Sequence, residues 1–124
     1  MNTIKISDKD IKVKVSLFVY LDENHPDGNV FVAYCPSLNL VGYGNGEENA
    51  KKDFEWIMDD YLTDMMSQGT LKEDLISLGW TESKKIFNEP KISFMVSHNK
   101  QLADVIDGGN YRNINIGKTC TTFA

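Results

Sequence analysis

Hydrophobic and polar residues alternate along the first third of the chain, which is the pattern of half-buried strands. The alternation predicts strands over residues 11–21 and 30–34, joined by a loop over 22–29 that contains Pro, Gly, Asn and Asp. Pro36 cannot donate to a ladder, so we expect the second strand to end there. A short third strand over residues 38–43 would complete an antiparallel meander.

A helical period replaces the alternation after three closely spaced glycines. Apolar residues recur at steps of three and four over residues 47–67, and they form one face that a helix would bury: Ala50, Phe54, Ile57, Met58, Tyr61, Leu62 and Met65. Asn45 is the expected N-cap and Gly69 the expected end. The pattern therefore predicts one long amphipathic helix directly after the meander.

The second half of the chain has weaker patterns. Thr70 and Glu73 have the spacing of a capping box, which predicts a second helix that ends at Gly79. We expect a loop over residues 80–90, with the alternative that residues 84–87 extend a strand.

The C-terminal quarter adds a fourth strand over residues 91–96 and a short helix capped by Ser97 and ended by the Gly108–Gly109 pair. Residues 111–116 alternate and predict a last strand, and we expect residues 119–124 to be a tail.

These elements predict an α+β fold with a mainly antiparallel sheet of three to four strands, in the order strand–strand–strand–helix–helix–strand, and helices packed on one face. There are no internal repeats and no linker-like segment. We therefore expect one domain over residues 1–124.

Composition narrows the class of partner. The chain has 124 residues, of which 41% are hydrophobic, and a net charge of -5. An acidic surface disfavours nucleic acid, because phosphate contacts need clustered Lys and Arg, and it favours a basic protein. No segment has the pattern of a signal peptide or approaches the roughly 18 apolar residues of a membrane span, so we expect a cytoplasmic protein that does not enter a membrane.

Cysteine and histidine are too few and too dispersed for a zinc site. Cys35 and Cys120 lie far apart in sequence and in no CxxC pair, and His25 and His98 are the only histidines. We expect both cysteines to be free, buried thiols. The sequence predicts no cofactor and no metal.

The segment YCPSLNLVGYGNGEENA resembles the signature of the HicB antitoxins of bacterial type II toxin–antitoxin systems. The matching residues are Tyr34, Pro36, Leu38, Gly42, Gly44, Gly46 and the helix start at residues 47–50. The resemblance covers roughly residues 12–96. It implies a partial ribonuclease-H-like fold, in which one or two helices cover a sheet of three or four strands.

The same resemblance implies a function. HicB proteins bind and neutralise HicA, a small basic toxin that cleaves mRNA, and many also carry a C-terminal DNA-binding module. Here the segment after Val96 has one short helical stretch and only three cations, Lys100, Arg112 and Lys118. We therefore expect no separate DNA-binding domain, and DNA binding is doubtful.

The predicted partner-binding residues lie on the long helix. They are the acidic residues Glu47, Glu48, Asp53 and Asp60, together with Trp56. Exposed Trp beside carboxylates is suited to anchor a basic protein. Two alternatives stay open: the carboxylates form an ordinary solvated helix face, and Trp56 packs under the second helix.

The sequence favours no catalytic residues. The interior of the first strand, residues 12–20, has no Asp or Glu to hold the metal of a nuclease, and Cys35 and the histidines have no orienting partner in sequence. We interpret Gly42, Gly44 and Gly46 as turning positions, with a positive φ at Gly44, and not as a phosphate loop.

Three functions remain, in decreasing order of support. The first is an antitoxin-like module that occludes a basic toxin without catalysis. The second is an orphan domain of the same fold that forms homo-oligomers through a sheet edge. The third is a nuclease or other hydrolase.

Overall fold

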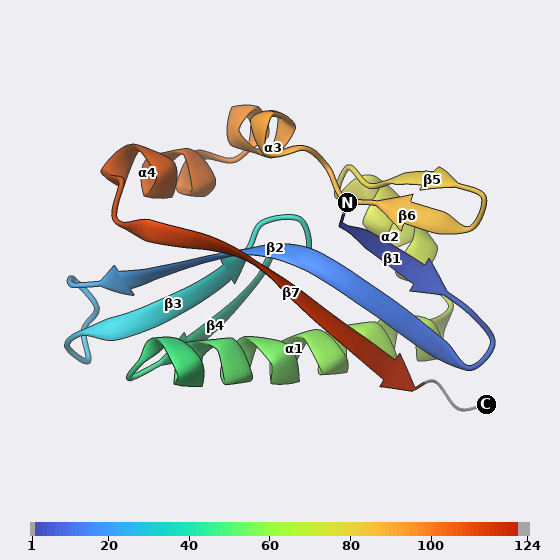
Figure 1. The fold of residues 1–124 in the computed structure, drawn as a ribbon, viewed down its shortest axis with the longest axis horizontal. Coiled ribbons are helices and arrows are strands. Elements are labelled where there is room, and N and C mark those ends of the chain that lie inside the picture. The colour runs from blue at the N-terminus through green and yellow to red at the C-terminus, as the bar shows by residue number, and fades with distance from the viewer. Residues whose placement is uncertain (1, 122–124) are drawn as a thin grey trace.

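The protein has an α+β fold built around one mainly antiparallel sheet. A computed structural model describes residues 2–121, and within that range seven strands and four helices are present (Figure 1). In chain order they are β1 (Thr3–Ile6), β2 (Asp10–Asp22), β3 (Val30–Cys35), β4 (Leu40–Gly44), α1 (Glu47–Gln68), α2 (Leu71–Ser77), β5 (Thr81–Ser83), β6 (Ile86–Asn88), α3 (Ile92–His98), α4 (Lys100–Gly108) and β7 (Tyr111–Thr121).

Strand β2 organises the sheet. Along one edge it pairs with β7 without interruption, from Asp10 opposite Thr121 to Tyr20 opposite Tyr111. Its other edge pairs with β1 at one end and with β3 at the other, which leaves residues 14–17 without a strand partner on that edge. The sheet therefore runs β4-β3-β2-β1-β6-β5, with β7 as the outer strand beside β2.

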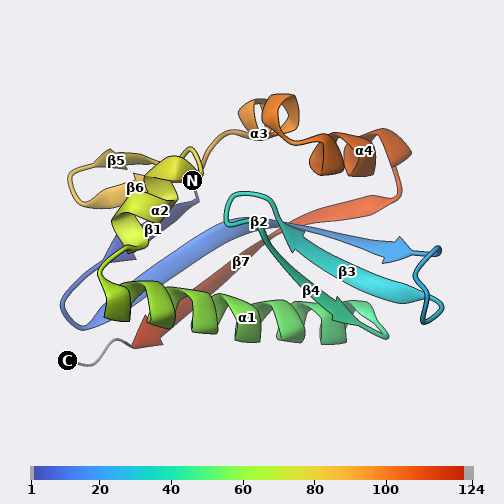
Figure 2. The ribbon, with the colours of Figure 1, turned by 180° about the vertical axis from the view of Figure 1, so that it is seen from behind.

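Helices cover both faces of the sheet, so the expectation of helices on one face is wrong. Helix α1 lies on one side of the sheet, and α3 and α4 lie on the other (Figures 1 and 2). Leu71 and Leu75 of α2 are buried in the same cluster as the core residues of α1. Residues 15–19 of β2 are all buried, which removes the alternation that a one-sided sheet would show. Val15, Leu17 and Val19 pack with α1, whereas Phe18 packs with Met95 and Leu102.

The meander and the long helix are confirmed. Strand β3 ends at Cys35, directly before Pro36, and α1 ends at Gly69, whose φ of 70° is left-handed. The buried residues of α1 are Ala50, Phe54, Met58 and Leu62, all from the predicted apolar face.

The predicted side-chain caps are wrong. Gly46, not Asn45, is the N-cap of α1, and Thr70 makes no capping hydrogen bond at the start of α2. At the start of α4 the capping side chain belongs to Asn99, which accepts from Leu102 N, and not to Ser97.

Residues 91–96 are not a strand, because most of them form α3. Met95 is buried in the cluster around Phe18, and Ser97 Oγ donates back to Phe94 O, as a helical turn allows. Strand β7 already pairs with one edge of β2, so no further strand can pair there. Tertiary packing thus overrides the strand-like composition of KISFMV.

The sheet is larger than the expected three to four strands. Residues 119–121 belong to β7 and not to a tail, while the rest of the predicted tail, residues 122–124, lies outside the described residues. Residues 80–90 contain the β5–β6 hairpin, whose turn has positive φ at Lys84 and Lys85. Strand β1 pairs with both β2 and β6 and carries the hairpin onto the sheet.

Close approach of backbone to backbone fixes α1 on β4. A Cβ atom on Gly42 would lie 2.4 Å from Phe54 N, and one on Gly44 would lie 2.5 Å from Ala50 N. Gly44 does not have the positive φ that we expected. These glycines are needed because α1 contacts the strand backbone directly, which also determines which side of α1 faces outward.

Candidate partner-binding surface

The side of α1 that faces away from the sheet carries an exposed Trp and two carboxylates. Trp56, Asp60 and Asp64 follow one another at four-residue steps, so they form one stripe, which we call the outer stripe. The Trp56 side chain is 67% exposed, the most exposed large hydrophobic residue in the described part of the chain. Trp56 does not pack under α2, so that alternative is wrong.

The two carboxylates of the outer stripe border a shallow hollow. It has a volume of about 500 Å³ and is lined by Asp60, Tyr61, Thr63, Asp64 and Ser67. Within residues 2–121, neither the Asp60 nor the Asp64 carboxylate takes part in an ion pair or a side-chain hydrogen bond. Both charges therefore remain available to a partner.

The acidic residues of the first turns of α1 have internal partners. The Glu47 carboxylate lies 2.7 Å from Arg112 Nη1 on β7, and the Glu48 carboxylate lies 2.7 Å from Lys51 Nζ. The hydrogen bond and charge of Lys51 lower the pKa of Glu48. Both ion pairs are solvent-exposed and contribute little to stability, but they reduce the negative charge offered to a partner.

Two further carboxylates of α1 bind the sheet. Asp53 accepts the backbone N–H of Tyr43 at 2.9 Å on β4. Asp59 accepts from Lys118 Nζ and from Cys120 Sγ, both on β7. Partial burial opposes ionisation of Asp59, but the Cys120 and Lys118 hydrogen bonds outweigh it, so its pKa is lowered. The same contact raises the pKa of Lys118.

The predicted site is therefore only partly one surface. Of its five residues, Trp56 and Asp60 lie on the outer stripe without internal partners. Glu48 lies two turns before Trp56 on the same row but is paired with Lys51, and Glu47 and Asp53 lie elsewhere on α1 with partners of their own. Asp64 also belongs to the outer stripe, but it is not among the predicted partner-binding residues. Its signal was present in the sequence, since it follows Trp56 and Asp60 at the helical step of four.

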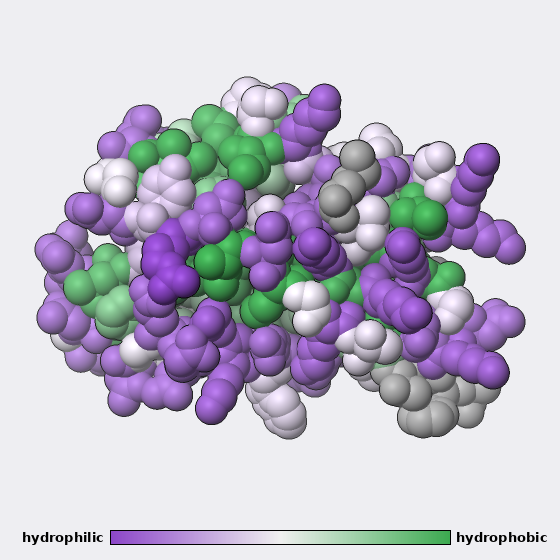
Figure 3. All heavy atoms as spheres, viewed as in Figure 1, coloured by the Kyte–Doolittle hydropathy of each residue, from purple (hydrophilic) through white to green (hydrophobic). Residues whose placement is uncertain are grey.

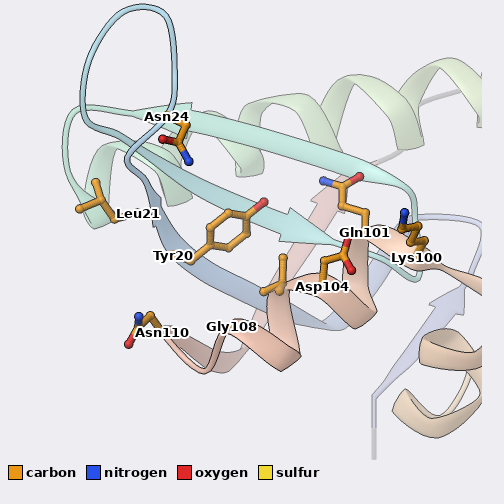
Figure 4. A pocket seen from close by; sticks show the side chains of 9 residues that line it. Tyr20, Leu21, Asn24, Lys100, Gln101, Asp104, Gly108 and Asn110 are labelled. Atoms are coloured by element: carbon orange, nitrogen blue, oxygen red, sulfur yellow. The ribbon is translucent and has the colours of Figure 1, made fainter.

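A second concave region lies between β2 and α4. Its volume is about 660 Å³, and its lining includes Tyr20, Asn24, Lys100, Gln101 and Asp104 (Figure 4). Burial raises the pKa of Tyr20, although the hydrogen bond from Gln101 acts in the opposite direction. One cation, one anion and two amides can bind a polar group, but this set holds no nucleophile beside a base.

A partly buried polar cluster lies at the gap in the edge of β2. The Glu89 carboxylate accepts from Ser16 N at 3.0 Å, from Ser37 Oγ at 2.5 Å and from Asn2 Nδ2 at 2.9 Å. Trp80 Nε1 donates to Ser37 O at 2.7 Å. Ser37 is fully buried, so its hydroxyl cannot reach a substrate. The cluster gives the Ser16 N–H an acceptor where no strand pairs with β2, and it links Ser16 to Ser37 and Asn2 through one carboxylate.

The thiols are free and buried, as predicted. Burial raises the pKa of Cys35 to about 12, and burial together with the Asp59 carboxylate raises the pKa of Cys120 to about 12. A thiol that stays protonated is a poor nucleophile. Among residues 2–121 there is no group of three or more His, Cys, Asp or Glu side chains that could hold a metal ion.

Comparison with known proteins gives no further constraint. No family model, no curated protein and no solved structure matches this chain. In the described range, no helix is both long and apolar enough to cross a membrane.

Proposed function

We propose that this protein is a HicB-like antitoxin that binds and neutralises a small basic, mRNA-cleaving toxin, without catalysis of its own. The observation that carries the proposal is the 67% exposure of Trp56 at the head of a stripe that ends in two carboxylates without internal partners. Such an arrangement suits recognition of a basic protein surface.

Trp56 would supply most of the binding free energy. Trp is enriched among the few interface residues that dominate affinity, because its large ring loses much hydration when a partner covers it. The ring face also attracts the cation of an Arg or Lys side chain. Asp60 and Asp64 follow at one and two turns, so a second and a third cation of the same partner would each meet a carboxylate.

The fold is compatible with the HicB resemblance. The meander of β2, β3 and β4 followed directly by α1 is the arrangement that the resemblance implies. Gly42 and Gly44, which belong to the matched signature, allow α1 to approach β4. These features support our proposal that the β2–α1 unit is a partial ribonuclease-H-like fold, to which β7, α3 and α4 would be additions.

The mechanism would be occlusion. A toxin seated on the outer stripe would have its basic, RNA-binding side covered by acidic protein. The net charge of -5 would speed association at low ionic strength, and the apolar contact with Trp56 would slow dissociation.

The test is co-expression with the product of a small basic reading frame adjacent to the gene. We expect a stable complex on purification and restored growth of cells that make the toxin. The double variant Asp60→Lys, Asp64→Lys should lose both the complex and the rescue. Glu23→Lys, Asp27→Lys changes the charge equally at two exposed positions of the β2–β3 loop and should retain both.

Circular dichroism of each purified variant separates misfolding from lost binding. A folded outer-stripe variant that still binds and rescues as well as the loop variant would contradict the assigned surface. Absence of any complex with wild-type protein would contradict the proposed function itself.

A further inference from the structure

Strand β7 forms a long outer edge of the sheet that no described strand covers. It pairs with β2 over eleven consecutive residue pairs, and its other edge has no partner within residues 2–121. We propose that a second copy of this chain pairs with that edge, antiparallel, with Ile116 of the two copies facing each other. The inference is independent of the proposed antitoxin role.

The backbone groups on the free edge can be identified from the polar cluster. Ser16 N–H donates to Glu89, so the hydrogen-bonding groups of Ser16 point away from β7. In an antiparallel ladder, the residue opposite such a position also points its N–H and C=O away from the pair. Asn115 is opposite Ser16, so its N–H and C=O point outward, and so do those of every second residue, including Asn113, Gly117 and Thr119.

The edge lacks the features with which proteins prevent strand pairing. It has no proline and no bulge in the ladder. Its two cations, Arg112 and Lys118, bind Glu47 and Asp59 and are drawn toward α1. In Figure 3, hydrophobic atoms lie between hydrophilic ones along the course that β7 follows in Figure 1. An unprotected strand of this length is a template for another strand.

The length and the charges of β7 together favour one register for a symmetric pair. With Ile116 on the two-fold axis, Lys118 faces Ile114 and Arg112 faces Cys120 of the second copy, and all eleven residues can pair. If Asn115 lay on the axis instead, Arg112 would face Lys118 and the like charges would oppose pairing. A slip by one residue would set outward groups against inward ones and lose the hydrogen bonds.

The strand is therefore complementary to itself, which is the property that an isologous interface requires. On the face that carries Tyr111 and Asn115, the same register places Asn113 opposite Thr119, and Asn115 opposite Gly117, of the second copy. Both Asn113 and Thr119 are exposed. The edge of one copy thus meets an equal edge of the other with no like charges opposite each other along the strand.

Charged substitutions at Asn113 and Thr119 test both the contact between the two copies and its register. Sedimentation velocity over a range of concentrations should show a dimer for the wild type. The variant Asn113→Lys, Thr119→Lys and the variant Asn113→Glu, Thr119→Glu should each dimerise roughly tenfold more weakly, because like charges would face each other twice. An equimolar mixture of the two variants should restore the dimer.

A matched control is Ser83→Lys, Ser93→Lys, which adds the same charge at exposed positions of β5 and α3 and should dimerise like the wild type. Thermal melting checks that every variant is folded. A wild-type protein that stays monomeric at all concentrations would overturn the proposal. It would do so even if the β7 edge pairs with a strand of a different protein. So would a dimer that the Lys and Glu variants leave unchanged.

Discussion

Helix α1 carries two sets of carboxylates that look alike in sequence and differ in the structure. Glu47, Glu48, Asp53 and Asp59 each contact a cation or a donor of the same chain. Asp60 and Asp64, with Trp56 one turn before, have no such contact among the described residues and face solvent. In the first set, Asp53 and Asp59 bind the sheet, and the charges of Glu47 and Glu48 are paired at the surface. The second set is available for binding.

The number of acidic residues on a helix therefore does not determine how much negative charge the helix exposes to a partner. Two of the internal partners, Arg112 and Lys118, come from β7, more than fifty residues later in the chain. Only the fold decides which carboxylates they neutralise. The predictions below test this division of α1 into a packed side and an outer stripe.

The largest effect is expected on the packed side. Gly42→Ala would place a Cβ atom 2.4 Å from Phe54 N and 2.7 Å from Ala50 O. Because both are backbone atoms, α1 must shift, and we expect the free energy of unfolding to fall by about 3 kcal/mol. Urea denaturation measures it. Gly108→Ala, at the end of α4, is the control: its Cβ would have no atom within 4 Å and its φ is not positive, so the free energy of unfolding should not fall.

The next prediction compares the contributions of two adjacent carboxylates, Asp59 and Asp60, to stability. Asp59→Asn removes the charge that binds Lys118 and should lower the free energy of unfolding by about 0.5–1 kcal/mol. Asp60→Asn should change it by less than about 0.5 kcal/mol, since no described group depends on that carboxylate. Equal losses for the two variants would remove the distinction between the packed side and the outer stripe.

The Asp59 effect should depend on pH in a defined way. The pKa of Asp59 is lowered, so its stabilisation is present above the ordinary value of 3.8 and is lost as pH falls through the lower folded value. The pKa of Lys118 is raised, so its stabilisation is present below 10.5 and is lost as pH rises through the higher folded value. The difference between wild type and Asp59→Asn should therefore be largest between these limits, in denaturation series across pH.

A smaller effect concerns the thiols. Because Cys35 and Cys120 are buried and their pKa values are raised to about 12, neither should react measurably with a thiol reagent at pH 8 in the folded protein. Both should react fully in denaturant. Rapid labelling of Cys120 in the native state would contradict the described position of β7 against Asp59.

We expect no specific binding of DNA. Two of the three cations after Val96, Arg112 and Lys118, already bind carboxylates of α1. The purified protein should therefore give no specific, salt-sensitive shift of its own promoter. A shift of that kind would show that the C-terminal segment binds DNA.

Local patterns predicted β2, β3, β4 and α1 because each of these elements has a strong period and a clear end, whereas no pattern predicted β1. Residues 47–67 have a continuous apolar stripe and a following glycine, and α1 is found within one residue of that range. The strand predicted over residues 91–96 is wrong because a short apolar run does not distinguish a strand from a helix. The outcome depended on β7, which already lies beside β2, and on the burial of Met95, a residue of α3, in the cluster around Phe18.

The candidate site was predictable only in part for a similar reason. Trp56 and Asp60 could be placed on one helix from sequence, and Asp64 follows from the same step of four. That Glu47 binds Arg112, or that Glu89 fills the gap at Ser16, depends on contacts between residues more than sixty positions apart. No local pattern contains that information.

The most direct test of the outer stripe is the dissociation constant for the basic toxin that we propose as the partner, measured by calorimetry for three proteins. Trp56→Ala should bind roughly 30-fold more weakly than wild type, as expected for an interface hot spot, and should melt like wild type. Glu48→Gln, whose charge is already paired with Lys51, should bind within about twofold of wild type. A folded Trp56→Ala protein that binds as tightly as wild type would contradict the account.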